Sequence, residues 1–464
     1  MLAPLAAWRA AGLGLIACAL PLSVGQAQVV LGPDQLRIAA TQELRVGAPD
    51  RALRYAKALT ERDATDLTAW LVQGRAHRTM GDYTAARKAA RTAWSLADTD
   101  EERYASALIM AQALSSDGRR TAAQLWLRRA GHHAPTPELE ARAKDHFRYV
   151  QSRNPWRTDF TFTFAPTSNV NNGSSKDRSR LNYQITDLLF GTPVEYQLSG
   201  ASQALSGLEL GATVNTRYRF RESASSADEI FAKASYRTFV LSDSARRDAP
   251  GVSGSDFAYG TLEFGWRHLQ MVQGGKAEHR YEISAGQSWY GGDRYASYAI
   301  FGASRTVALT PRSQLVMSAQ LREEVGQNTF DRRTFNIEAG VSRRLDSGAQ
   351  LSLSTGVATT ASPRDEAEYD ELRLRASYRP KSDIMGVQMQ YGLTARWRDY
   401  DVSRHDASGR TDMSLFADAT ATFKDIDYYG FNPAVTVRGN FTDSNINLFD
   451  LEQVTVGLGI RSEF

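Results

Sequence analysis

The period of the hydrophobic pattern changes once in this 464-residue chain, between Asn154 and Lys176. Before this stretch Ala and Leu recur at helical spacing, and after it apolar and polar residues alternate nearly to the last residue. Pro155 cannot continue a helix, and Asp159–Phe164 alternates strictly before the turn formers that begin at Ala165. The sequence therefore predicts an α + β multidomain protein with helices first and strands second.

The N-terminus is typical of an export signal. Arg9 is its only charge, Ala10–Leu20 is apolar, and small residues end at Ala27, so residues 1–27 are predicted to be a signal peptide. The sequence Leu15–Cys18 also fits bacterial lipoprotein processing, which would lipidate Cys18 instead. No later stretch has the roughly 18 apolar residues that a spanning helix needs, so a membrane-spanning form would have to be a β-barrel.

Residues 28–153 show an internal repeat. Gly47 recurs 34 residues later as Gly81, which is the tetratricopeptide period. A third unit with Gly118 is offset by 37 residues, which predicts an extra half-turn or loop near residues 98–102. Stacked helix pairs form a concave surface that typically binds peptide, whereas a plain helical bundle is the alternative. The residues predicted to pack the repeat are Trp70, Gly74, Gly81, Tyr83, Ala86 and Ala93.

Residues 154–464 contain about fourteen alternating segments, which predicts a transmembrane antiparallel β-barrel. Tyr369–Arg379 shows the pattern, with apolar residues on one face and charged residues on the other. With an even number of strands, the chain enters and leaves the barrel on the same side of the membrane. Residues 168–205 should therefore face outward, and the helices should lie in the periplasm. The residues predicted to line the lumen are Glu263, Glu282, Glu338, Arg373, Arg375, Arg379, Arg396 and Arg398.

The end of the chain is consistent with this barrel. Alternation continues through Val454–Arg461, and the last residue is Phe464. A terminal strand that ends in an aromatic residue resembles the feature by which the barrel assembly machinery recognises its substrates. We therefore expect that machinery and outer-membrane lipid among the partners.

Composition and motifs argue against several other functions. The 55 basic and 52 acidic residues give a net charge of +3, too small to indicate a nucleic-acid partner. Acidic neighbours such as Glu323-Glu324 face opposite sides of a strand, and no Ser/His/Asp arrangement is placed by a motif. His132-His133 lacks accompanying metal ligands. We expect no enzymatic activity, no cofactor and no metal.

The order of these parts resembles the Slam family, the surface lipoprotein assembly modulators. The resemblance rests on a signal peptide, a few tetratricopeptide repeats and a junction motif that comprises Asn154, Pro155, Trp156, Asn169 and Asn171. It implies an outer-membrane translocator that assists export or surface display of client lipoproteins or secreted proteins. The repeat domain would receive the client or a periplasmic chaperone, and the barrel would be the conduit.

Two other functions remain open from the sequence. Exopolysaccharide exporters also join tetratricopeptide repeats to a barrel, although they usually carry many more repeats. A porin or receptor with an accessory repeat domain is the other alternative. The sequence identifies neither a client nor an oligomeric state.

Overall fold

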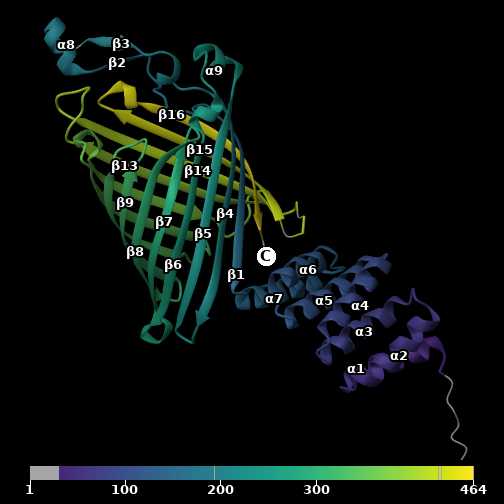
Figure 1. Ribbon diagram of the computed structural model, residues 1–464. Helices are drawn as coiled ribbons and strands as arrows, with labels where there is room; N and C mark the ends of the chain where they lie inside the picture. The colour runs from purple at the N-terminus through teal and green to yellow at the C-terminus, as the bar shows by residue number, and fades with distance from the viewer. Residues whose placement is uncertain (1–30, 193, 427, 430, 463–464) are drawn as a thin grey trace, which may run out of the picture.

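The computed structural model describes residues 31–192, 194–426, 428–429 and 431–462. The predicted signal peptide with Cys18 and the terminal Phe464 lie outside these residues. Figure 1 shows helices packed in a row at one end of a closed barrel, and a group of short elements at the other end. We call α1–α7 the helical region.

Seven consecutive helices form the helical region as antiparallel neighbours. Each turn within a pair contains a glycine at positive φ, namely Gly47, Gly81 and Gly118, which ends one helix and starts the next. Among the described residues, no helix combines the length and the apolar character that a membrane crossing requires. The helices are α1 (Pro33–Arg45), α2 (Pro49–Arg62), α3 (Leu67–Thr79), α4 (Tyr83–Leu96), α5 (Asp100–Ser116), α6 (Arg120–His132) and α7 (Pro137–Arg153).

The third repeat is longer because of a helix, not a loop. The connection between α4 and α5 covers residues 97–99, one residue fewer than the connection at 63–66 between α2 and α3. By contrast α5 has 17 residues and α3 has 13. A capping box formed by Thr99 and Glu102 starts α5 immediately, so the added residues extend the helix.

Small residues let the helices approach closely. Ala86 and Ala93 are fully buried, and a Cβ on Gly74 would lie 2.8 Å from Ile109 Cγ2 on α5. Trp70 is half-buried and its Nε1 donates to Ala64 O at 2.8 Å, while Tyr83 is half-buried at the start of α4. Gly74 and Ala86 therefore lie where α3, α4 and α5 meet.

Replacing Gly74 with Ala should destabilise the helical region by about 1–3 kcal/mol, because α3 and α5 would have to separate. Thermal unfolding of the full chain, followed by circular dichroism at 222 nm, measures the effect. Thr68→Ala changes an exposed position on the same helix and should leave the helical transition in place. Equal transitions for both variants would contradict the close contact.

Fourteen antiparallel strands close into a barrel, which confirms the predicted strand number and fold class. The order around the barrel follows the sequence and returns from β16 to β1. The strands are β1 (Trp156–Thr167), β4 (Gly207–Glu222), β5 (Ser226–Leu241), β6 (Tyr259–Val272), β7 (Ala277–Tyr290), β8 (Asp293–Thr310), β9 (Ser313–Gly326), β10 (Arg332–Arg344), β11 (Gln350–Ala361), β12 (Tyr369–Arg379), β13 (Val387–Tyr400), β14 (Arg410–Phe423), β15 (Phe431–Ser444) and β16 (Leu451–Ser462).

The barrel wall has an apolar outer face and a charged inner face. On β6, Phe264 is 58% exposed whereas its neighbour Glu263 is 8% exposed. On β12, Leu372 and Leu374 are exposed while Glu371 on the same strand is buried. Apolar residues outward and ion-paired residues inward are the pattern of a transmembrane barrel.

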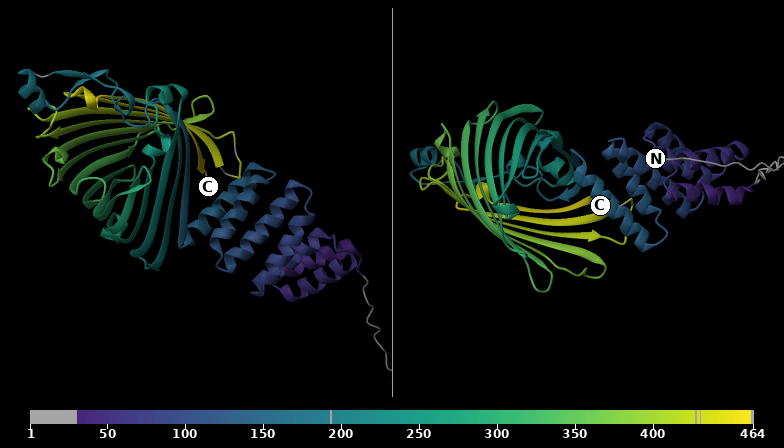
Figure 2. Two further views of the ribbon diagram at one scale, coloured as in Figure 1. Left: turned by 45° about the horizontal axis from the view of Figure 1, so that its top comes forward. Right: turned by 90° about the horizontal axis from the view of Figure 1, so that it is seen from below.

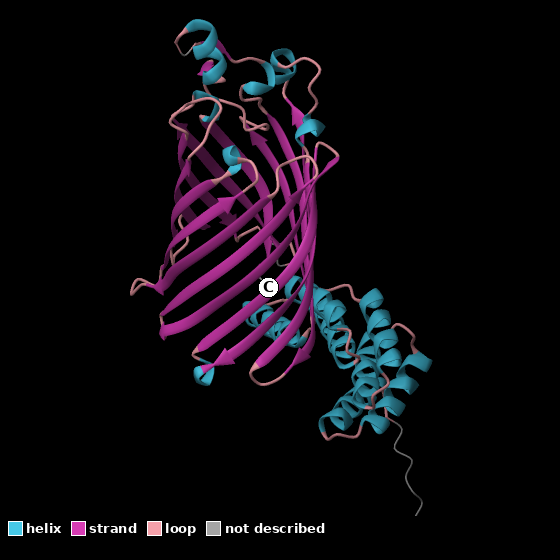
Figure 3. Ribbon diagram, turned by 60° about the vertical axis from the view of Figure 1, so that its left-hand side comes forward, coloured by secondary structure: helices cyan, strands magenta, loops and turns pink. Residues whose placement is uncertain are grey.

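The two ends of the barrel differ in their connections. At the end nearest the helices, connections are short, as at residues 223–225 and 311–312. At the other end, residues 168–206 form the longest connection, with β2 (Arg178–Arg180), α8 (Tyr183–Phe190) and β3 (Glu195–Gln197), and α9 (Asp243–Asp248) follows β5 (Figure 3). We call these the inner and outer ends of the barrel.

Candidate functional site: the seam between the first and last strands

The barrel is closed by β1 and β16, and this pair has the shortest pairing in the wall. Within residues 156–462 as described, these strands are in register only at Phe164↔Leu458 and Thr167↔Thr455, both in the outer half of β1. Every other neighbouring pair is in register at nine or more positions. We call this incomplete junction the seam (Figure 2).

Exposure confirms where the seam opens. Both faces of β1 are exposed from Arg157 to Phe162, including Asp159 and Thr161, which alternate with the outward phenylalanines. On β16, a Cβ on Gly457 would lie 3.7 Å from Ala165 Cβ, but a Cβ on Gly459 would meet nothing within 4 Å. The strands therefore touch at Ala165 and lie apart two residues closer to the inner end.

Backbone groups on the free strand edges of the seam can form hydrogen bonds with another chain. An unpaired strand edge presents a row of N–H and C=O groups that can pair with an added strand. The unpaired half of the seam lies between the charged interior and the apolar outer face of the wall. The seam is thus a place where an extended polypeptide could bind and where an apolar group could pass sideways.

The outer end of the seam is held closed by the asparagine part of the predicted junction motif. Asn169 is fully buried; its Nδ2 donates to Gly173 O at 2.8 Å and its Oδ1 accepts from Gly173 N at 3.0 Å. This turn presents Asn169 O to the Gln453 side chain of β16. Ser168 N donates to Val454 O at 3.0 Å, and the two threonine hydroxyls of Thr167 and Thr455 bond at 3.0 Å.

Asn171 secures the same turn to the start of β4. Its Nδ2 donates to Ala201 O at 2.7 Å and to Gln203 O at 2.8 Å, and its Oδ1 accepts from Leu205 N at 2.9 Å. These partners lie 30 to 34 residues away in the sequence. The Asn-Xaa-Asn element therefore fixes the outer end of β1 between its two neighbouring strands.

The other half of the motif lies at the inner end. Asn154 Nδ2 donates to Thr121 Oγ1 of α6 at 3.0 Å, and Asn154 Oδ1 accepts from Trp156 N at 3.2 Å. Pro155 O accepts from Arg219 N of β4 at 2.9 Å, and the Trp156 ring packs on Tyr218 at 4.7 Å between centroids. This short connection ties α7 and α6 to the β1 side of the seam.

The helical region also contacts the other side of the seam. Arg128 of α6 donates to Tyr429 O at 3.2 Å, and its guanidinium carbon lies 4.2 Å from the Phe431 ring centroid at the start of β15. The rings of His132 and Tyr429 lie 4.3 Å apart. Helix α6 therefore reaches from the β1 connection to the turn between β14 and β15, across the inner end of the seam.

A cationic groove lies on the helical region close to this point. It is a cavity of about 360 Å³ between α3, α5, α6 and α7, and Arg78, Arg120, Arg153 and His146 line it. Within the part of the chain that is described, no carboxylate pairs with any of the three arginines. Arg153 instead lies 4.4 Å from the ring of Tyr149, also in the lining. The groove thus offers positive charge and an aromatic wall.

The structure places the predicted lumen residues on the inner face in two groups. Glu263 accepts from Lys233 Nζ at 3.0 Å, and Glu282 accepts from Arg267 Nε at 2.9 Å, so these carboxylates are ion-paired with neighbouring strands. Glu338 has an inward position on β10. The five remaining residues, Arg373, Arg375, Arg379, Arg396 and Arg398, lie together on β12 and β13.

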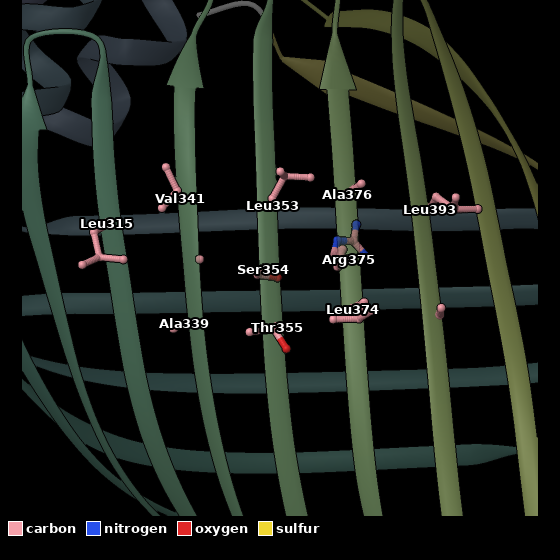
Figure 4. Close-up of a pocket in the computed structure, with 12 residues that line it drawn as sticks. Leu315, Ala339, Val341, Leu353, Ser354, Thr355, Leu374, Arg375, Ala376 and Leu393 are labelled. Carbon is pink, nitrogen blue, oxygen red and sulfur yellow. The ribbon is translucent and has the colours of Figure 1, made fainter.

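The outer face of the barrel has an apolar depression of about 570 Å³ over β9 to β13 (Figure 4). Leucines such as Leu315, Leu353 and Leu393 surround small residues including Ala339 and Ala395. A hollow with this lining matches the acyl chains of surrounding lipid. Among the described residues, no group of three or more His, Cys, Asp or Glu side chains could hold a metal ion.

Neither the seam nor the cationic groove was predicted from the sequence. The seam depends on backbone pairing between strands that are about 290 residues apart. The alternation of side chains does not indicate how far two such strands pair. The groove assembles residues from four helices, from Arg78 to Arg153. Only the asparagines near the end of β1 marked the region in advance.

No protein-family model matches this sequence, and no curated protein sequence matches it. Among solved structures, the type III secretion translocator chaperone SycD of Yersinia enterocolitica aligns with a TM-score of 0.24 and 21% identity, over 27% of this chain and 88% of that one. OccAB3 of Acinetobacter baumannii aligns with a TM-score of 0.33 and 8% identity, over 65% and 98%. An anion-selective porin from Comamonas acidovorans aligns with a TM-score of 0.30 and 10% identity, over 66% and 100%. TM-scores this low support no conclusion about function.

Proposed function

We propose that this chain is an outer-membrane translocator that assists export or surface display of client lipoproteins or secreted proteins. The helical region would lie in the periplasm and receive the client or its chaperone, and the barrel would be the conduit. The observation that carries this proposal is the seam, which is open at the end where the helical region lies. The resemblance to the Slam family points to the same activity.

The cationic groove supports a receiving role for the helical region. Three arginines without carboxylate partners favour an acidic segment of an incoming chain. Arg153 ends α7, and Trp156 begins β1 three residues later. A peptide that leaves the groove would therefore meet the unpaired edge of β1 first.

The seam also suits a lipidated client. The charged inner wall is a poor path for an acyl chain, because exposing each CH2 group to water costs about 0.8 kcal/mol. A lateral opening lets the acyl chain remain among lipids while the polypeptide crosses through the interior. In a barrel without a lateral opening, the acyl chain and the polypeptide would both have to cross the hydrated interior.

Deletion of the gene, followed by quantitative proteomics of surface-exposed and secreted proteins, tests the proposed function. We expect one or a few lipoproteins or secreted proteins to disappear from the surface and accumulate in the periplasm. Reintroducing the wild-type gene should restore them. An unchanged surface proteome and secretome would exclude client export.

The placement of the two ends can be checked separately. A cysteine at Leu188, which is 85% exposed on α8, should react with a membrane-impermeant maleimide on intact cells. A cysteine at Ala224, exposed in the turn between β4 and β5, should react only after the outer membrane is permeabilised. The reverse labelling pattern would invert the proposed orientation.

A further inference from the structure

Two arginines stand directly opposite each other inside the barrel. Arg373 on β12 and Arg396 on β13 are register partners, and both face inward because their neighbours Leu372 and Trp397 are exposed on the outer face. Like charges directly opposite on adjacent strands destabilise a sheet. Their pairing here calls for a compensating negative charge.

The two guanidinium groups turn away from each other. Arg373 Nη2 donates to Asn336 Oδ1 on β10 at 3.3 Å, and Arg396 Nη2 donates to Ser414 Oγ on β14 at 3.2 Å. The Nε atoms of both arginines are buried and have no hydrogen-bond partner. Each therefore retains a strong donor that the described protein atoms leave unsatisfied, at a cost that a bound acceptor would remove.

The surrounding carboxylates offset the charge of this pair only in part, through an ion pair between Arg373 and Glu371. The inward positions of β12 and β13 hold five arginines and one carboxylate, Glu371. Glu371 accepts from Arg398 Nε at 2.7 Å and lies 3.5 Å from Arg373 Nε. Arg375 donates to Thr394 Oγ1 at 3.2 Å, a neutral partner. Among the described residues, no carboxylate forms an ion pair with Arg396, Arg375 or Arg379, whose partners are neutral.

On the opposite wall, around β5 to β7, the inward carboxylates form ion pairs with arginine or lysine side chains. Glu229 on β5 accepts from Arg217 at 3.0 Å and from Arg219 at 2.9 Å. Glu282 on β7 contacts both Arg267 and Lys233. On β12 and β13, by contrast, three of the five inward arginines, Arg375, Arg379 and Arg396, have neutral hydrogen-bond partners.

We infer that β12 and β13 form an oxyanion-binding site centred on Arg373 and Arg396. Guanidinium groups bind phosphate and carboxylate oxygens through paired, charge-assisted hydrogen bonds. The two Nε–H groups and the excess of positive charge suit one such anion between the arginines. The ligand is an oxyanion group, either a free phosphate or a carboxylate on a chain inside the barrel. The site does not depend on the proposed export function.

Equilibrium binding of radiolabelled inorganic phosphate to the purified full chain in detergent tests this site. Wild-type protein should bind one phosphate per chain, and Arg396→Gln or Arg373→Gln should weaken binding at least about tenfold, as expected for loss of a charge-assisted contact. Arg322→Gln is the matched control, because this inward arginine already pairs with Glu324 at 2.9 Å. Its phosphate affinity should remain within about twofold of wild type.

Thermal unfolding provides a second readout that a structural role would not reproduce. Without phosphate, Arg396→Gln should unfold at a higher temperature than wild type, because the like-charge pair is removed. Added phosphate should stabilise wild type and not the variant. Competition by a short polyglutamate separates the two sources of the anion: displacement of phosphate indicates that a carboxylate chain binds the same arginines. Absence of saturable phosphate binding, or equal weakening by Arg322→Gln, would overturn the inference.

Discussion

Closing the inner half of the seam with a disulfide should stop client export. Cysteines at Thr163 and Gly459 occupy neighbouring positions across the open half, in the register set by Phe164↔Leu458. Under oxidant, a disulfide would form whenever the two strands approach each other and would hold the seam closed. Surface display of the client should then fall to the level of the deletion strain. A reducing agent should restore it. Quantitative surface proteomics measures the change.

The control is a disulfide where the strands already touch. A Cβ on Gly457 lies 3.7 Å from Ala165 Cβ, close to the mean Cβ–Cβ distance of about 3.8 Å in disulfides. Ala165→Cys with Gly457→Cys should therefore crosslink readily and leave export unchanged. The sequence contains one cysteine, Cys18, so few competing pairs exist. Efficient crosslinking at 163 and 459 with normal export would contradict a role for the opening.

Removing the two asparagines of the outer clamp should destabilise the whole barrel. The combined variant Asn169→Ala and Asn171→Ala deletes five side-chain hydrogen bonds at the end of β1. Leaving buried polar partners unsatisfied costs about 1–3 kcal/mol each, so we expect a loss of about 4 kcal/mol or more in the free energy of unfolding. Chemical denaturation in detergent, followed by tryptophan fluorescence, measures it.

A matched asparagine separates seam opening from general destabilisation. Asn445 also uses both side-chain atoms, accepting from Thr411 N and donating to Gly409 O, but it does not connect β1 with β16. Asn445→Ala should lower stability without affecting the Ala165–Gly457 crosslink. The double variant at 169 and 171 should reduce that crosslink as well. Equal crosslinking in both would show that the asparagines do not hold the seam.

The sequence was sufficient for the barrel because alternation is a local property. The predicted number of about fourteen segments agrees with the fourteen observed strands, since inward and outward environments impose a period of two on every strand. The helical repeat followed from the recurrence of Gly47 and Gly81. The length of the third repeat was ambiguous because spacing alone does not distinguish an added loop from the longer α5.

The candidate site could not be predicted because its contacts are distant in the sequence. Asn171 looked like part of a loop, yet its partners are Ala201, Gln203 and Leu205. The absence of pairing between β1 and β16 leaves no trace in residue type, since Thr161 and Thr163 suit a paired strand equally well. The arginines of β12 and β13 were expected in the lumen, but their shortage of partners depends on the neighbouring strands.

The bridge that α6 makes across the inner end of the seam has a thermodynamic consequence. Because one helix contacts both sides, a change in the width of the opening would have to move this helix or break one of its contacts. A ligand that binds the helices more tightly in one position will shift the width, by no more than the difference between its two binding free energies. The coupling is reciprocal, so a chain lodged between the strands must alter affinity at the groove by the same factor. Ligand binding at the groove and the width of the seam would then report on the same conformational equilibrium.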